Sequence, residues 1–288
     1  MSNWLHNLPI IWMAIVVFGV CYFVAAVVFF AVDALGRSRS GAAFRGLSPG
    51  MLSPLGVIFG LLVAFIAAQV WNDVEHARLA VDREASSLRT AVQLAGVFPH
   101  DVDTHLRQLV RRHIDDAVSQ EWPRMADQSA TVHVTAPALA EALQFALTVD
   151  PKTPGQTTAQ KELASTLESA LQSRRERIIL SRSNVNWVKW TCVFAQALFV
   201  MIAIAFVHID NRGASAVAIA LFTTGFAVSV LLIASHDCPF TGDISIKPDV
   251  LLQVKPDENS ALLGNRPSLG SFLEKEERLI YRVDLPVA

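Results

Sequence analysis

Charged residues and cysteines are scarce in this chain. Only 17% of its 288 residues are Asp, Glu, Lys or Arg, and the formal net charge of −2 gives no basis for binding nucleic acid. Three cysteines do not indicate a disulfide framework. The sequence also lacks a nucleophile elbow, a P-loop, a GxGxxG turn and an HExxH pair. We therefore predict no catalytic residues and no cofactor, and we do not expect an enzyme.

Hydrophobic residues, by contrast, make up 52% of the chain and are concentrated in four runs. These runs are Leu8–Val32, Pro54–Trp71, Trp187–Val207 and Ala214–Ser235, and the only charge within them is Lys189. Each is near the roughly 20 apolar residues that cross about 30 Å of hydrocarbon. The sequence therefore predicts an all-α integral membrane protein with four transmembrane helices in a lipid bilayer.

Four spans place both termini and the long segment between spans two and three on one side of the membrane. Seven arginines flank the spans on that side, against four in the loops on the other side. The positive-inside rule then places the termini and the segment in the cytoplasm. The expected organisation is spans one and two in residues 1–71, a cytoplasmic helical region in 72–186, spans three and four in 187–236, and a C-terminal tail in 237–288.

The segment between spans two and three reads as a helical bundle. The second span has no helix-breaking residue after Trp71, so we expect its helix to continue to about Phe98, before Pro99. Apolar residues repeat every three or four positions between Pro99 and Pro123, and again from Leu163 to Ile178 after a capping box at Thr157-x-x-Gln160. In the tail, Ile244–Ile246 and Ile280–Val283 are candidates for short strands.

The second span has two different faces. One carries small residues at a spacing of four, Gly56, Gly60, Ala64 and Ala68, which would let another helix approach closely and favours a homo-oligomer. The opposite side either faces lipid and other spans or lines an apolar constriction with a polar mouth. The candidate pore-lining residues on that side are Leu55, Ile58, Leu62, Phe65, Ile66, Gln69 and Asp73. Spans one, two and four have no ionisable residue well inside the bilayer, which argues against an ion-coupled pump.

Three short motifs carry a resemblance to a known family. They are Glu84-Ala85 after span two, Glu121-Trp122-Pro123 at the end of the next helix, and Pro239-Phe240-x-Gly242 after span four. In their order and spacing, over roughly residues 50 to 250, they resemble the bacterial bestrophin-like family, a domain family of unknown function. The resemblance implies a four-span oligomeric membrane protein related to the bestrophins, which are pentameric anion channels. Bestrophins carry an acidic calcium-binding cluster after the fourth span; here Asp237 and Asp243 are isolated.

Taken singly, each motif has a structural interpretation. Glu84 is expected to be a charge on a solvated helix face, Trp122-Pro123 to fix a helix end, and Pro239–Gly242 to be a turn that seats Phe240 at the membrane interface. The basic cluster Arg174–Arg182, just before span three, is expected to meet anionic lipid. His236, Asp237 and Cys238 suggest a metal, but adjacent residues rarely converge on one ion and no second cluster supplies ligands, so we predict no metal site.

Two functions remain open at this stage. The first is an oligomeric, bestrophin-like channel that passes ions passively, with span two lining an axis. The second is a membrane-anchored interaction or sensor module without transport activity, whose protein partner the sequence does not identify. A ring of subunits around a continuous pore is needed by the first function and not by the second.

Overall fold

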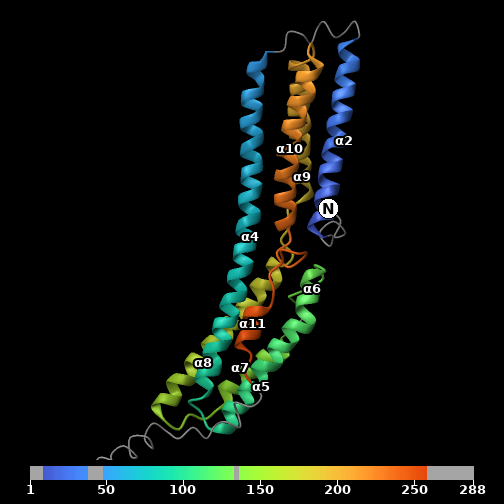
Figure 1. Cartoon of the computed structure of the whole chain (residues 1–288). Coiled ribbons are helices and arrows are strands. Elements are labelled where there is room, and N and C mark those ends of the chain that lie inside the picture. Colours follow the sequence, from blue (N-terminus) through green and yellow to red (C-terminus); the bar gives the residue numbers. More distant parts are fainter. Residues whose placement is uncertain (1–8, 38–47, 133–135, 258–288) are drawn as a thin grey trace, which may run out of the picture.

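The computed structural model describes residues 9–37, 48–132 and 136–257, and within these ranges all regular structure is helical. Four helices run side by side as a membrane bundle (Figure 1). They are α2 (Ile10–Gly36), the first half of α4 (Leu52–Ala95), α9 (Trp187–Val207) and α10 (Arg212–His236). Each is long and apolar enough to cross a membrane, and together they coincide with the four predicted spans.

Helix α4 is a single rod of 44 residues, about 66 Å long, which belongs to both halves of the molecule (Figure 1). It begins at Leu52 after the short 3₁₀ turn η1 (Pro49–Met51), and Ser48 accepts a hydrogen bond from the Gly50 N–H. Pro54 is therefore inside the first turn, where its missing N–H costs nothing. The rod ends at Ala95 rather than Phe98, because the chain turns over residues 96–98 before Pro99 caps the next helix.

Further helices pack against one side of the second half of α4, and with it they form what we call the distal bundle (Figure 1). These are α5 (His100–Asp116), the π-helical turn η2 (Ala117–Glu121), α6 (Trp122–Ala126), α7 (Pro137–Thr148), α8 (Pro154–Leu180) and α11 (Asp249–Val254). They share one apolar core, which includes Leu88 of α4, Leu109 of α5, Leu139 of α7 and Leu167 of α8. The apolar stripes seen in the sequence lie in this core.

The cap of α8 lies one turn earlier than predicted. Thr153 Oγ1 accepts from the Gln156 N–H at 3.2 Å, and Gln156 Oε1 accepts from the Lys152 N–H at 2.8 Å. Gln160, the predicted partner of Thr157, instead donates to the carbonyls of Ala146 and Val149, closing the connection from α7. Both positions offer a Thr-x-x-Gln pattern, and Pro154 at the first helical position selects the earlier one.

Polar side-chain pairs join helices within the membrane bundle and connect this bundle to the distal bundle. Lys189, the charge within span three, donates to Gln69 of α4. One turn further along α4, Asp73 accepts from Ser183 at 2.7 Å. These two contacts join α4 to the first turn of α9 and to the α8–α9 connection, on the side where the distal bundle begins. At the far end of the spans, Arg212 pairs with Asp33 at 2.8 Å.

The tail after α10 folds as turns where a strand was predicted. The Ile246 N–H donates to the Pro239 carbonyl at 2.9 Å, and the Ser245 N–H donates to the Gly242 carbonyl at 3.3 Å, so the predicted strand Ile244–Ile246 is wrong. Gly242 has a φ of 85°, which a side chain would strain. The second strand candidate, Ile280–Val283, lies outside the described residues.

Candidate functional site

The family-motif residues, far apart in the sequence, meet around one arginine of the distal bundle. Glu84 comes from α4, Glu121 from the last position of η2, and Trp122 from the first position of α6. All three contact Arg177 of α8, which the sequence analysis did not single out as a site residue.

Arg177 is fully buried, and each nitrogen of its guanidinium has a partner. Its Nε and Nη2 donate to the two oxygens of Glu84, at 2.7 Å and 3.2 Å. Nη2 also donates to Glu121 Oε2 at 2.9 Å, and Nη1 lies 3.5 Å from the Met125 sulfur. The guanidinium carbon lies 4.6 Å from the Trp122 ring centroid, a cation–π contact. A planar, permanently charged fork suits this combination of bidentate pairing and stacking.

Two further side chains complete what we call the ionic cluster: Glu84, His113, Glu121, Arg174 and Arg177. Arg174, one turn before Arg177, donates from Nε and Nη2 to Glu121 Oε1 at 2.7 Å and 2.5 Å. His113 of α5 places Nε2 at 2.9 Å from Glu84 Oε1. An ionised carboxylate only accepts hydrogen bonds, so His113 carries a proton on Nε2. Two carboxylates and two guanidiniums balance in charge.

The electrostatics of the cluster keep both partners of its central pair ionised. Burial alone would raise the pKa of Glu84, but the charge of Arg177 and the hydrogen bond from His113 outweigh it and lower the pKa to about 2. Burial alone would lower the pKa of Arg177, but the carboxylates of Glu84 and Glu121 raise it above its ordinary value. A buried ion pair of this kind is costly to break, because the remaining charge has no water to solvate it.

Glu121 reaches the arginines from a wide turn in the helix. Pro123 was predicted to end this helix, yet the chain passes through the π-turn η2 and continues as α6 to Ala126. Pro123 lacks an N–H, and its ring would clash with the carbonyl four residues earlier in a regular helix. A π-turn relieves such a clash, and π-turns inside helices are frequent at functional sites.

The tail packs against Trp122 on the cluster. The Trp122 indole N–H donates to the Ile246 carbonyl at 3.0 Å, and its ring meets Phe240 edge-on with centroids 5.8 Å apart. Phe240 is buried in the core of the distal bundle, so its predicted place at the membrane interface is wrong. Pro239–Gly242 does form the predicted turn, and Thr241 donates to the Ala126 carbonyl at 2.7 Å.

Residues after span four have separate partners. The His236 ring stacks on Trp71, Asp237 accepts from the Val185 N–H at 2.6 Å, and Gln128 donates to the Cys238 sulfur at 2.8 Å. Burial, together with the nearby Asp237 carboxylate, raises the pKa of Cys238 to about 12, which leaves it an unreactive thiol. Within the described part of the chain, no group of three His, Cys, Asp or Glu side chains could hold a metal ion.

Two expectations about charged residues were wrong for the same reason. Glu84 was expected on a solvated face, and Arg174 and Arg177 at the lipid surface, yet these three are buried in the cluster; Arg175 and Arg182, the other arginines of the predicted lipid-facing group, are exposed. A signal was present in the sequence: Leu163, Leu167, Arg174 and Ile178 follow one stripe of α8 at helical spacing, as Val81, Glu84 and Leu88 do on α4. A charge inside an apolar stripe indicates a buried partner on another helix.

The small-residue face of α4 is turned away from the other helices of the chain. Gly56, Gly60, Ala64 and Ala68 are exposed, and a Cβ built at Gly56 or Gly60 meets no atom within 4 Å. Val57, Leu61 and Phe65 lie on the same outer surface, with exposed fractions of 66%, 55% and 65%. Within residues 9–37, 48–132 and 136–257, no helix packs on this surface.

The structure divides the seven candidate pore-lining residues into two groups. Ile58 and Phe65 are exposed. The other five contact helices of the same chain: Ile66 is buried, Leu55 and Leu62 pack partly buried in the membrane bundle, Gln69 accepts from Lys189, and Asp73 accepts from Ser183. Because these five hold the bundle together, they do not present a free surface.

Comparison with known proteins identifies the fold. A family model described as the Bestrophin-like domain matches residues 18–251. A point variant of a bacterial bestrophin homologue from Klebsiella pneumoniae is 12% identical, with a TM-score of 0.63 over 87% of this chain and 99% of the other. A second structure of a bacterial bestrophin homologue from the same organism is 13% identical, with a TM-score of 0.59 over 88% and 99%. No curated protein matches the chain.

Neutralising Glu84 tests the energetic weight of the cluster. Glu84→Gln leaves a shape of similar size but removes the charge that faces Arg177, so we expect the free energy of unfolding to fall by about 3 kcal/mol or more. Thermal and denaturant unfolding of the detergent-purified protein measure this. Glu75→Gln, at an exposed position two turns earlier on α4, is the matched control and should change stability by less than about 0.5 kcal/mol. Equal effects of the two substitutions would contradict the assignment.

Acid should weaken the wild-type protein through the same residue. The pKa of Glu84 lies near 4.5 when unfolded and is about 2 when folded, so the carboxylate stabilises the fold above pH 4.5 and loses this effect as the pH falls towards 2. Between pH 6 and pH 3, the free energy of unfolding of the wild type should fall by about 2 kcal/mol more than that of Glu84→Gln. Parallel stability–pH curves for the two proteins would refute this.

Proposed function

Because the Bestrophin-like domain model covers most of its length, this chain belongs to the bestrophin-like family, and we propose that it assembles into a homo-oligomeric channel that passes ions passively. The observation that carries the proposal is the outer surface of α4. It runs along the whole 66 Å rod and is exposed throughout, and in the membrane half it carries four exposed small residues at a spacing of four.

The outer surface of α4 changes character along its length. In the membrane half it presents Val57, Leu61 and Phe65, one turn apart; in the distal half it presents the polar side chains of Glu75, Asp82 and Ser86. The buried side of the same helix carries Val70, Ala77, Glu84 and Leu88. Copies arranged with α4 innermost would form one conduit, apolar within the bilayer and polar within the distal bundle.

The narrow part of this conduit is the apolar stretch. Rings of Val57, Leu61 and Phe65 would form a hydrophobic constriction of the kind that gates by expelling water. Of the predicted pore-lining residues, the proposed conduit retains Ile58 and Phe65, and it adds Val57 and Leu61. The other five predicted residues form the side of α4 that packs against the chain's own helices. They are Leu55, Leu62, Ile66, Gln69 and Asp73.

The ionic cluster supports this arrangement from behind. Glu84 lies on the side of α4 opposite the proposed conduit and is fixed by Arg177 of α8 and His113 of α5. A change in the distal bundle at these residues would therefore move the rod that also carries Phe65. We assign the cluster a positioning role, not contact with ions.

For the orientation, we propose that the distal bundle and both termini are cytoplasmic in a bacterial inner membrane. The arginine majority on that side of the spans supports this assignment. Lys189 and the tryptophans Trp71 and Trp187 mark the boundary on the distal side.

Polar substitutions in the proposed constriction test ion passage. Leu61→Ser and Phe65→Ser should each raise ion flux in liposomes severalfold above wild type, because a polar wall holds water in the constriction. Ile15→Ser is the matched control: Ile15 is exposed on α2 and should leave flux unchanged. If all three variants behave alike in correctly inserted protein, the membrane-anchored interaction or sensor module without transport becomes the better description.

The small-residue surface makes a separate prediction about assembly. A Cβ at Gly60 meets no described atom within 4 Å, so Gly60→Leu should leave the fold of the monomer unaffected. If another subunit packs there, the added side chain separates the backbones and the oligomer should dissociate in native mass spectrometry. Gly19→Leu on α2, another exposed glycine with no atom near its Cβ, should leave the oligomer intact. An oligomer unchanged by Gly60→Leu would remove this surface from the subunit contact.

A further inference from the structure

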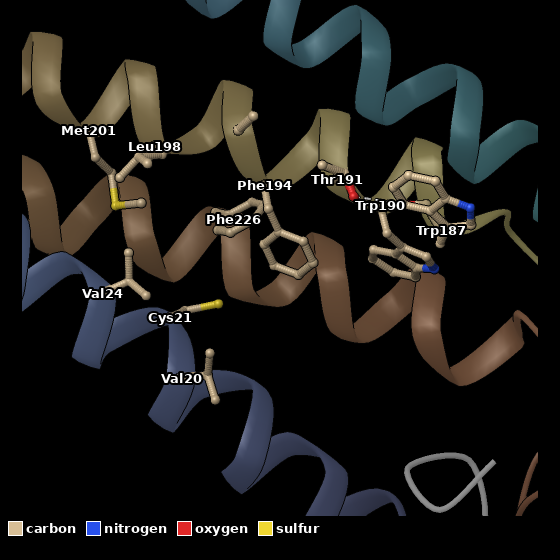
Figure 2. A pocket seen from close by; sticks show the side chains of 11 residues that line it. Val20, Cys21, Val24, Trp187, Trp190, Thr191, Phe194, Leu198, Met201 and Phe226 are labelled. Atoms are coloured by element: carbon tan, nitrogen blue, oxygen red, sulfur yellow. Dashed lines mark hydrogen bonds between the residues drawn. The ribbon is translucent and has the colours of Figure 1, made fainter. Parts of the chain in front are cut away.

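The membrane bundle holds a groove of about 700 Å³ between α2 and α9, with α10 behind it (Figure 2). Val20 and Val24 of α2 face Phe194 and Leu198 of α9 across it, and Phe226 of α10 lies at its back. Its lining residues all belong to the spans, and none comes from α4. The groove is therefore separate from the proposed conduit.

The chemistry of the groove selects an apolar occupant. Aliphatic and aromatic side chains dominate its wall, and the one hydroxyl, Thr191 Oγ1, is already donated to the Trp187 carbonyl. Water in such a space would find few hydrogen-bond partners, because the remaining polar groups of the lining are the Cys21 thiol and the indole N–H groups of Trp187 and Trp190, and the Trp190 N–H is buried without a partner among the described residues. Within a bilayer, the surrounding medium that can fill it is hydrocarbon.

The length of the groove distinguishes a lipid chain from a protein helix. Along α9 it runs from Trp187 to Met201, a rise of about 21 Å. Trp187 is the first residue of the span, so the groove starts at the membrane surface and ends about two thirds of the way across a hydrocarbon core of about 30 Å. A transmembrane helix of another subunit would follow the full thickness. An acyl chain enters from one surface and ends inside the core.

The surface end of the groove suits a headgroup. Trp187 is 71% exposed there, where tryptophan rings prefer to lie between headgroup and hydrocarbon. The exposed Arg182 precedes the span by five residues and places a positive charge at the same membrane surface. We propose that the groove binds one acyl chain of a phospholipid from the leaflet next to the distal bundle, with its headgroup near Trp187 and Arg182. This site does not depend on ion passage.

Filling the groove tests the proposal. The full-length protein is stripped of lipid in detergent, phosphatidylglycerol or phosphatidylcholine is added, and bound lipid per subunit is counted by native mass spectrometry. Ala195→Trp fills the groove from α9 and should lower occupancy by both lipids at least tenfold. Val24→Phe fills it from the facing wall and should lower occupancy too, which covers a failure of the first variant to fold. Ala216→Trp, at an exposed position of α10 outside the groove, should retain the lipid.

The headgroup and the identity of the occupant are tested in the same experiment. Arg182→Gln should weaken phosphatidylglycerol binding severalfold and leave phosphatidylcholine binding unchanged. Wild-type occupancy in both groove-filling variants would overturn the proposal. So would an oligomer that dissociates in Ala195→Trp and Val24→Phe but not in Ala216→Trp, because the groove would then be a contact between subunits.

Discussion

The pairing of Arg177 with two carboxylates is the contact on which the distal bundle depends. It joins α8 to α4 through Glu84 and to the π-turn through Glu121, and His113 adds α5 to the same point. Apolar contacts between these helices would tolerate a shift of one residue along their axes. A buried guanidinium with bidentate partners does not, because any shift leaves a charge without a partner. The cluster therefore fixes the register of the bundle, and replacing it with hydrophobic residues could preserve stability while losing that register.

Helix α4 belongs to both halves of the molecule, and its inner and outer sides differ in what they contact. Its inner side is apolar in the membrane, polar at the junction through Gln69 and Asp73, and alanine-rich with one glutamate in the distal bundle. Among the described residues, no helix of the chain covers its outer side along the same length. A surface helix is usually polar on its free side, but the free side of α4 is apolar in the membrane half, where Val57, Leu61 and Phe65 are exposed. The free side is the part of the molecule that a second copy would complete.

The spans and the helical nature of the middle segment could be predicted because each depends on local sequence. A run of about 20 apolar residues matches the thickness of the bilayer and therefore predicts a span. The apolar stripes between Pro99 and Ile178 indicate helices with one buried side. The cluster could not be assembled in this way. Periodicity shows that Glu84 and Arg177 each lie on a buried stripe, but it does not show that the two stripes face each other. For α4 within the bilayer, both sides are apolar, so helical periodicity separates Ile66 from Gly60 without showing which one meets the chain's own helices.

The π-turn at Ala117–Glu121 has a consequence for how this chain can vary over evolution. A π-turn holds one residue more than a regular helical turn, so it is in effect an insertion that the helix has absorbed. Deleting a single residue there would restore an ordinary helix and rotate everything after it by about 100°. Trp122 would leave both Arg177 and the tail carbonyl of Ile246. The number of residues in this turn is therefore constrained together with Glu121, which the turn holds against Arg174 and Arg177.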